Sequence, residues 1–293
     1  MGNLDAAALR AAYGGPHELV TTSDGKTLFV RRWGTADKAP VSVLIIHGIT
    51  AHSGPYGPML AETLALAGFN VFGMDLRGHG LSDGVRGDYP SEDRLVKDLS
   101  ETVALVKGKS RKLVVLGHSL GALVAVVAAK SRPVDIDGLV LISAAKKVRA
   151  GVYAKPSAGA TFRALLGATL MQGTPLIEYR RSGMLGLDDP LFNFRYSARF
   201  YSVLYGVGAL SVSRMLRTGI IASPHLELDG RFRKPLLIAV GDGDELFAVD
   251  SAREFYEGID AEDKEFLVVP GARHAVFPKD AWGPLVLWLQ TKF

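Results

Sequence analysis

The pentapeptide GHSLG at residues 117–121 places a serine between two glycines inside the most apolar stretch of the chain, LVVLGHSLGALVAVVAA. This G-x-S-x-G pattern is typical of a nucleophile elbow, a strand-to-helix turn so sharp that it requires small residues two positions before and after the serine. The turn would hold the Ser119 hydroxyl at a helix N-terminus, where the partial positive charge favours a developing anion. The pattern predicts that Ser119 is a nucleophile.

Two simpler interpretations of this stretch compete with the nucleophile. A membrane span is rejected, because residues 117, 118 and 121 interrupt the run and the uninterrupted part stays short of the roughly 18 to 20 apolar residues required. A buried strand followed by a buried helix, with Ser119 as a polar N-cap, accounts for the segment taken alone. The choice depends on partners elsewhere in the chain.

A nucleophilic serine needs a base to take its proton and a carboxylate to orient that base. In this arrangement the partners follow in the order serine, acid, histidine, each just past a late strand. His274 follows the apolar run FLVVP and is the predicted base, whereas the other candidate histidines lie before the acid strand. Asp242, Asp244 and Glu245 all follow the run LLIAV, so position alone leaves the acid open.

Acyl transfer also needs two hydrogen-bond donors for the oxyanion. The backbone N–H of Leu120, directly after the serine, is the first predicted donor. The run VSVLIIHG ends at Gly48, which lets the backbone approach a substrate closely, so the Ile49 N–H is the second, with Thr50 as the alternative. The loop MDLRGHGLSDG, residues 74–84, is expected to brace the nucleophile loop without a catalytic role.

Alternating strand and helix patterns would position these residues. The first seventy residues are interpreted mainly as strands and tight turns, with a hairpin about Asp24-Gly25 and a helix over residues 58–68. Ser91 is the predicted N-cap of an amphipathic helix. Buried strands are predicted at residues 41–48, 70–75, 112–119, 138–145, 234–244 and 264–274, with helices at 120–131, 249–258 and 280–293. The alternation favours an α/β fold with a parallel, doubly wound sheet.

The alternation stops after Ala145, and for about eighty residues no buried strand is predicted. Helical patterns instead cover residues 161–171 and 192–219. We therefore divide the chain into an α/β core, residues 1–145 and 227–293, and a helical cap insertion, residues 146–226. Two roles, which do not exclude each other, are open for the apolar residues of the insertion: to line a tunnel and to hold the insertion together. These residues are Tyr153, Phe162, Tyr179, Phe192, Phe194, Tyr196, Phe200, Tyr201, Tyr205, Leu165, Leu166, Leu170, Met171 and Met215.

Charge and composition limit the function further. The chain has no cysteine, which excludes disulfides and thiolate metal sites. The N-terminus lacks the pattern of a signal peptide, so we expect a cytoplasmic protein. The insertion holds eleven Lys and Arg against three acids, which would attract an anionic lipid surface or an anionic substrate, whereas no nucleic-acid motif accompanies it. The basic residues are Lys146, Lys147, Arg149, Lys155, Arg163, Arg180, Arg181, Arg195, Arg199, Arg214 and Arg217.

The motifs IIHGI, MDLRGHGLSDG, LGHSLGA, GDGDE and PGARHAVF, in this order, resemble the α/β-hydrolase superfamily. They are most similar to its monoacylglycerol lipase and lysophospholipase group, the serine aminopeptidase S33-like hydrolases. The resemblance implies a mostly parallel eight-stranded sheet with helices on both faces and a cap between strands six and seven. It also implies an acid three residues after a glycine that follows the sixth strand, which favours Asp244.

The activity implied by the resemblance is hydrolysis of a carboxylic ester through an acyl-serine intermediate, with no metal or organic cofactor. A monoacylglycerol-like or other medium-chain ester is the expected small-molecule substrate. The alternatives are a lactonase, a thioesterase or a peptidase with the same triad, and a non-catalytic binding protein that keeps the fold. An aminopeptidase would need an acidic group to hold the substrate amine, and the insertion is poor in acids.

Overall fold

The computed structural model describes the chain except for residues 1–4, 35–38, 154–156, 180, 182, 209–217, 219, 222, 229–231 and 279. The expectations for Lys155, Arg180, Arg214, Met215 and Arg217 therefore lie outside the described residues. In the described part, no helix is both long enough and apolar enough to cross a membrane.

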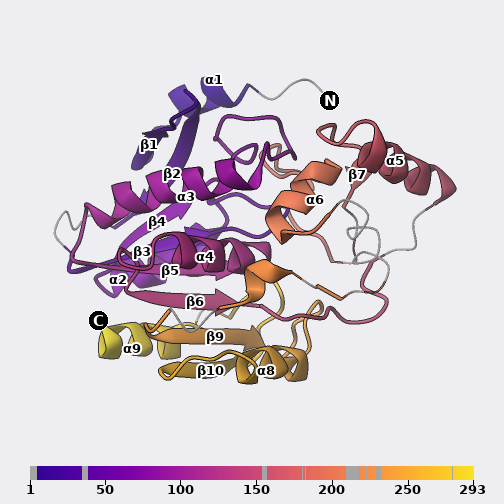
Figure 1. Cartoon of the computed structure of the whole chain (residues 1–293). Coiled ribbons are helices and arrows are strands. Elements are labelled where there is room, and N and C mark those ends of the chain that lie inside the picture. The colour runs from indigo at the N-terminus through magenta and orange to yellow at the C-terminus, as the bar shows by residue number, and fades with distance from the viewer. Residues whose placement is uncertain are drawn as a thin grey trace.

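Eight strands form the main sheet, in the order β1-β2-β4-β3-β5-β6-β9-β10 (Figure 1). Only β1 with β2 and β2 with β4 pair antiparallel; the remaining neighbours are parallel. The predicted α/β fold with a mostly parallel eight-stranded sheet is confirmed. The strands are β1 (His17–Thr21), β2 (Thr27–Trp33), β3 (Val41–Ile46), β4 (Asn70–Met74), β5 (Lys112–His118), β6 (Gly138–Ile142), β9 (Leu236–Gly241) and β10 (Lys264–Val269).

Helices cover both faces of the sheet because the inner strands are apolar on both sides. In β3, Leu44 and Ile46 join one core cluster while Val43 and Ile45 join the other. The first cluster includes side chains of α3 (Glu92–Lys107), α4 (Leu120–Ser131) and α8 (Val249–Glu257). The second includes side chains of the π-helix η1 (Gly57–Ala61), α2 (Glu62–Leu66) and α9 (Gly283–Lys292).

Of three local structures predicted in the first hundred residues, two are confirmed and one was wrong. The hairpin is confirmed, with Gly25 at a φ of 75° in its turn. The Ser91 hydroxyl accepts a hydrogen bond from the Arg94 amide, so the predicted N-cap is confirmed too. The expectation of strands and turns before the hairpin was wrong, because α1 (Ala6–Ala11) is a short helix capped by Asp5. Its alanine-rich sequence favours a helix.

The insertion lies between β6 and β9, the sixth and seventh strands of the main sheet. It contains α5 (Ala158–Thr169), the two-residue strands β7 (Ile177–Glu178) and β8 (Arg195–Tyr196), α6 (Ala198–Tyr205) and the 3₁₀ helix η2 (Pro224–Leu226). The prediction of no buried strand is not contradicted by β7 and β8, since each has two residues and one of them is exposed. The helix predicted to start at residue 192 was wrong, because α6 begins at Ala198. Ser197 caps α6, and Gly206, at a φ of 61°, ends it. The exact bounds of the cap, residues 146–226, stay a prediction.

One part of the insertion is hydrogen-bonded directly to the core. The Asn193 backbone N–H donates to the Thr50 carbonyl over 2.9 Å, and its side-chain amide donates to the Gly78 carbonyl over 2.7 Å. The Ser197 hydroxyl donates to the Asp88 carboxylate over 2.5 Å. These contacts hold residues 193–197 beside the loops that follow β3 and β4, at the carboxyl edge of the sheet.

Candidate active site

Ser119 lies in the turn between β5 and α4, with φ 56° and ψ −119°. Such a backbone is strained for a residue other than glycine, and the surrounding structure must hold it. A Cβ on Gly117 would lie 2.1 Å from the Gly121 carbonyl oxygen, and one on Gly121 would lie 2.1 Å from the Ile46 carbonyl oxygen. The two glycines of G-x-S-x-G are thus required by direct backbone contact.

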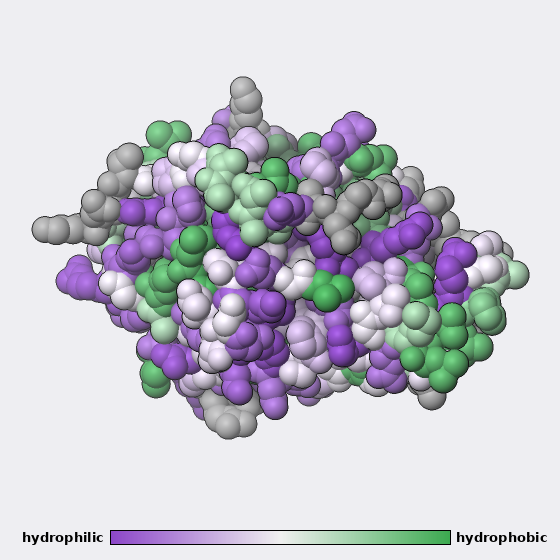
Figure 2. Space-filling model, turned by 90° about the horizontal axis from the view of Figure 1, so that it is seen from above, coloured by the Kyte–Doolittle hydropathy of each residue, from purple (hydrophilic) through white to green (hydrophobic). Residues whose placement is uncertain are grey.

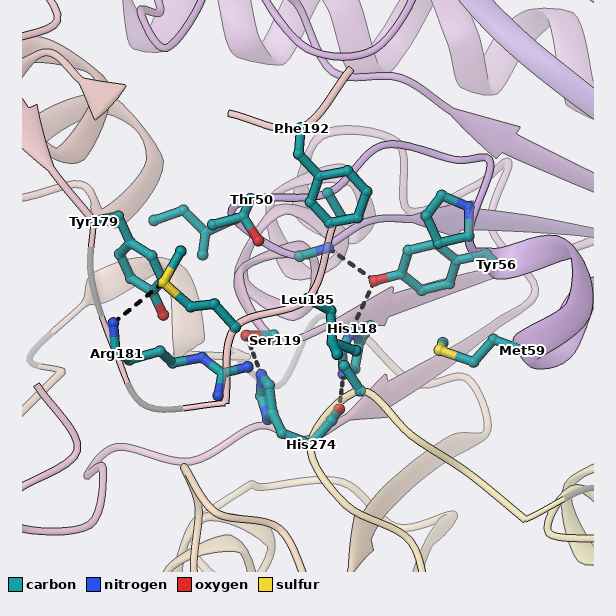
Figure 3. A pocket seen from close by; sticks show the side chains of 16 residues that line it. Thr50, Tyr56, Met59, His118, Ser119, Tyr179, Arg181, Leu185, Phe192 and His274 are labelled. Carbon is teal, nitrogen blue, oxygen red and sulfur yellow. Dashed lines mark hydrogen bonds between the residues drawn. The ribbon is translucent and has the colours of Figure 1, made fainter. Parts of the chain in front are cut away.

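The structure brings Ser119, His274 and Asp244 into one hydrogen-bonded line (Figure 3 shows the serine and the histidine). His274 Nε2 lies 3.1 Å from Ser119 Oγ. His274 Nδ1 lies 3.1 Å and 3.2 Å from the two carboxylate oxygens of Asp244. An ionised carboxylate only accepts, so Nδ1 carries the proton and Nε2 is left to accept from the serine hydroxyl.

Asp244 is held in the ionised form that this line requires. Its Oδ1 accepts the backbone amides of Leu246 and Phe247 over 2.8 Å and 2.9 Å, and its Oδ2 accepts the Ser143 hydroxyl over 2.7 Å. Burial raises the pKa of Asp244, but the hydrogen bond and charge of His274, followed by those other donors, bring it down to about 2. The carboxylate is therefore charged at neutral pH.

The two competing acids have other contacts. Asp242 accepts the Gly271 amide over 2.8 Å, and Glu245 accepts the backbone amide of His274 over 3.0 Å. Both hydrogen bonds hold the loop that carries His274 in place. The acid strand itself is β9, the seventh strand of the sheet, so the expectation that the acid follows the sixth strand was wrong.

The predicted oxyanion donors lie on either side of the serine. Both residues are buried; Ile49 lines the pocket and Leu120 directly follows Ser119. Among the described residues, neither backbone N–H donates to a protein acceptor. His47 fixes the peptide that contains the Ile49 N–H. Its Nε2 accepts the Leu76 amide, so its Nδ1 carries the proton and donates to the Gly48 carbonyl over 2.8 Å.

A hydrogen-bonded chain that the sequence did not reveal links this loop to His274. The Gly48 amide donates to the Tyr56 hydroxyl over 2.9 Å, and that hydroxyl donates to His118 Nδ1 over 2.7 Å. His118 Nε2 then donates to the His274 carbonyl over 2.7 Å (Figure 3). The direction is fixed because a carbonyl can only accept. Burial, followed by the charge of His274, lowers the pKa of His118 to about 3 and keeps its ring neutral.

Removing the Tyr56 hydroxyl should disturb the site as well as the fold. Tyr56→Phe leaves the Gly48 amide and His118 Nδ1 without their partner, so we expect kcat on an ester to fall roughly tenfold and the free energy of unfolding to fall by about 1–3 kcal/mol. Tyr89→Phe is the matched control, since its buried hydroxyl donates to Asp98 away from the serine. Equal losses of kcat in both variants would contradict a positioning role for Tyr56.

The loop at residues 74–84 was expected to support the nucleophile loop, but its hydrogen bonds go to the segment after β3. Asp75 accepts the Ser53 amide over 2.6 Å, and His79 Nε2 lies 3.2 Å from the Ile49 carbonyl oxygen. The cap residue Tyr196 also donates its hydroxyl to the Ile49 carbonyl. The loop therefore supports the segment after β3 rather than the nucleophile turn, because β3 and β4 are direct neighbours in the sheet.

Three buried histidines, which stay neutral in the folded protein, should make the fold less stable as the pH falls from about 6.5 to 5. Burial is the main cause that lowers the pKa of His47 to about 4, that of His118 to about 3, and that of His79 well below its usual value. Below pH 6.5 the unfolded chain binds protons that the folded chain does not. The free energy of unfolding should then fall with pH by up to about 1.4 kcal/mol per pH unit for each histidine.

Urea unfolding at pH 7.0, 6.0 and 5.0 measures this slope. The carboxylate of Asp244 adds nothing in that window, because its stabilisation is lost only as pH falls through about 4 toward 2. A constant free energy of unfolding between pH 7 and 5 would show that these histidines are not buried in neutral form.

A pocket opens above Ser119, with a volume of about 120 Å³ (Figure 3). The core supplies Ile49, Thr50, Ala51, Pro55, Tyr56, Met59, His118, His274 and Ala275 to its walls, and the insertion supplies Tyr179, Arg181, Met184, Leu185 and Phe192. Of the aromatic residues proposed for a tunnel, only Tyr179 and Phe192 line this pocket. Phe200, Tyr201 and Tyr205 are buried in the core cluster instead, and Phe162 is exposed.

The strand order of the sheet, together with a serine in a strand-to-helix turn facing a histidine and a carboxylate from later loops, defines the α/β-hydrolase class. In the described part of the chain, no group of three or more potential ligand side chains is arranged to hold a metal ion. The family model described as serine aminopeptidase, S33, matches residues 37–280, and the chain belongs to this family.

Relatives and solved structures point to the same group within the class. The chain is 29% identical to the monoglyceride lipase of Rattus norvegicus over 89% of this chain and 83% of that protein. It is 27% identical to the monoacylglycerol lipase of Mycolicibacterium smegmatis over 83% and 84%. The crystal structure of Paleococcus ferrophilus monoacylglycerol lipase matches with a TM-score of 0.63 and 28% identity, covering 91% of this chain and 99% of that one. The resemblance to monoacylglycerol lipase-like serine hydrolases is confirmed.

Proposed function

We propose that this carboxylic ester hydrolase acts through Ser119, His274 and Asp244 on monoacylglycerol-like or other short- to medium-chain esters. His274 takes the serine proton as Oγ bonds to the acyl carbon, and returns it to the alcohol as the old C–O bond breaks. The Ile49 and Leu120 amides stabilise the oxyanion. Water, deprotonated by His274, then releases the acid and regenerates the serine. The single observation that carries the proposal is the 3.1 Å contact between Ser119 Oγ and His274 Nε2.

The pocket walls support an ester rather than a peptide substrate. Most are apolar, and none of the described lining residues is an aspartate or a glutamate that could hold a substrate amine. A volume of about 120 Å³ leaves room for roughly ten non-hydrogen atoms. That size fits a short or medium acyl chain with a small alcohol.

A chain-length series tests the proposal. We expect hydrolysis of 4-nitrophenyl esters and 1-monoacylglycerols, with kcat/KM highest for short or medium chains. Thioester, lactone and aminoacyl anilide substrates of matched size complete the panel, because the same triad can attack each of them. Turnover of the anilide alone, with no ester cleaved, would refute the proposal.

We further propose that the cap contacts an anionic lipid surface through α5. This helix projects from the molecule (Figure 1), and apolar residues gather over it on the surface (Figure 2). Phe162, Leu165 and Leu170 are 65%, 57% and 80% exposed. Arg163 on the same helix, and the basic excess of the insertion, would add attraction to anionic headgroups.

Vesicle flotation tests the lipid contact. The protein should float with phosphatidylglycerol vesicles more than with phosphatidylcholine vesicles, and the double variant Phe162→Ser and Leu165→Ser should lose most of that binding. Leu66→Ser is the matched control, because Leu66 is 90% exposed on α2. No flotation with either vesicle, or equal loss in the control, would contradict the contact. Separately from the lipid contact, we propose that the protein is located in the cytoplasm.

A further inference from the structure

Among the described residues, one charged side chain lines the pocket, and the hydrolysis of a neutral ester does not use it. Arg181, between β7 and β8 of the insertion, is the only Lys, Arg, Asp or Glu among the described lining residues. Figure 3 shows its side chain extending from the cap toward Ser119 and His274. Only 8% of that side chain is exposed. Burying a guanidinium in a protein is costly unless its charge is paired or hydrogen-bonded.

One carboxylate of the core, that of Glu245, faces both Arg181 and Arg273. Arg181 Nη1 lies 3.4 Å from Glu245 Oε1, and Arg273 Nη2 lies 3.5 Å from the same oxygen. The other oxygen, Oε2, accepts the His274 amide. Two guanidinium groups thus face one carboxylate, and the three side chains together keep one net positive charge. The contact distance of 3.4 Å is also longer than that of a strong charge-assisted hydrogen bond.

We propose that Arg181 is a specificity residue that selects esters with a second, anionic oxyacid group, a carboxylate or a phosphate, near the scissile bond. The planar guanidinium suits both groups, and its place on the pocket wall lets a substrate anion reach it. A pocket built to bind a charged group discriminates strongly against an analogue that lacks it. This inference rests on the proposed ester hydrolysis and names its substrate class.

Two substrate pairs, each with the same ester but with or without an anionic group, test the preference and its source. On the acyl side, mono-4-nitrophenyl adipate is compared with 4-nitrophenyl hexanoate, which ends in a methyl group. On the alcohol side, 1-hexanoylglycerol 3-phosphate is compared with 1-hexanoylglycerol. The wild-type enzyme should cleave the anionic member of at least one pair with the higher kcat/KM, and the pair that responds tells whether the anion belongs to the acid or to the alcohol.

Arg181→Gln should reduce kcat/KM for that anionic substrate roughly 10- to 100-fold and for its neutral partner less than about threefold. Arg181→Lys should retain part of the preference. Arg273→Gln is the control, because Arg273 contacts the same Glu245 oxygen but is 57% exposed and does not line the pocket. It should leave the ratio of the two substrates unchanged.

The outcomes separate this inference from the proposed function. An unchanged ratio of anionic to neutral kcat/KM in Arg181→Gln, or no preference in the wild-type enzyme, would overturn the role of Arg181 while neutral ester hydrolysis stands. Equal losses on both substrates, with a lower melting temperature, would assign Arg181 to cap stability and would also overturn it. Only a failure to hydrolyse any ester would refute the underlying function.

Discussion

Ser119→Ala is expected to lower kcat on 4-nitrophenyl esters by roughly 10⁶-fold, to the rate left by substrate binding and the oxyanion donors. The alanine lacks the oxygen that bonds to the acyl carbon, and no other described hydroxyl contacts His274 Nε2. Stopped assays with purified protein, corrected for spontaneous hydrolysis, measure the loss.

The fold should survive this substitution. Ser119 keeps its place through a backbone hydrogen bond, in which its N–H donates to the Ile142 carbonyl over 2.9 Å, and through the two flanking glycines. Ser143→Ala, a change of the same size at the other serine with positive φ, is the matched control. It removes a hydrogen bond to Asp244 and should cost about 10-fold. Retention of more than a few per cent of wild-type kcat in Ser119→Ala would exclude Ser119 as the nucleophile.

Asp244→Asn is expected to lower kcat by about 10⁴-fold at neutral pH, equivalent to about 5.5 kcal/mol of barrier. An asparagine can present its NH₂ group to His274 Nδ1, which would place the ring proton on Nε2. That nitrogen could then no longer accept the proton of Ser119, 3.1 Å away. The loss should appear in kcat more than in KM, because Asp244 does not line the pocket.

Asp242→Asn separates the two acids that sequence position left as close rivals. Asp242 accepts only the Gly271 amide in the described structure, so this variant should stay within about threefold of the wild-type kcat. A larger loss in Asp242→Asn than in Asp244→Asn would reverse the assignment of the acid. Circular dichroism and thermal unfolding of both variants distinguish a catalytic defect from misfolding.

The sequence predicted the fold and the three candidate catalytic residues because both depend on local patterns. A serine between two glycines, placed after an apolar strand and before a helix, has few alternative conformations. Parallel strands bring their carboxyl ends to one edge, so residues after late strands meet there although they lie far apart along the chain. Order and position alone therefore pointed to Ser119 and His274, whereas Asp244 was favoured over Asp242 and Glu245 only by the family resemblance.

The supporting residues could not be found in this way. Ser143, Tyr56 and the ring of His118 act through hydrogen bonds whose partners depend on side-chain directions in the folded core. Only one signal was available for Ser143, its place near the end of the buried strand predicted at residues 138–145. Tyr56 follows β3 by ten residues and reaches the site through a loop that no local pattern defines.

The insertion was the least predictable part of the chain. Its aromatic residues at residues 192–205 have a spacing that suits a helix, yet residues 192–197 are not helical and are hydrogen-bonded to the core through Asn193. Composition also could not tell a pocket wall from a packed interior: Phe192 lines the pocket, whereas Phe200 packs fully buried against Tyr196. Burial against a partner decides between these roles, and for Phe200 that partner, Tyr196, belongs to the insertion itself.

Mass-spectrometric mapping of a fluorophosphonate adduct tests the central claim most directly, because the reagent bonds only to a serine activated by its neighbours. We predict one adduct per chain, on the peptide that contains Ser119, forming at least about 100-fold more slowly in His274→Ala. An adduct on another serine, or ester hydrolysis that continues in a protein whose Ser119 stays unmodified at saturating reagent, would contradict the account.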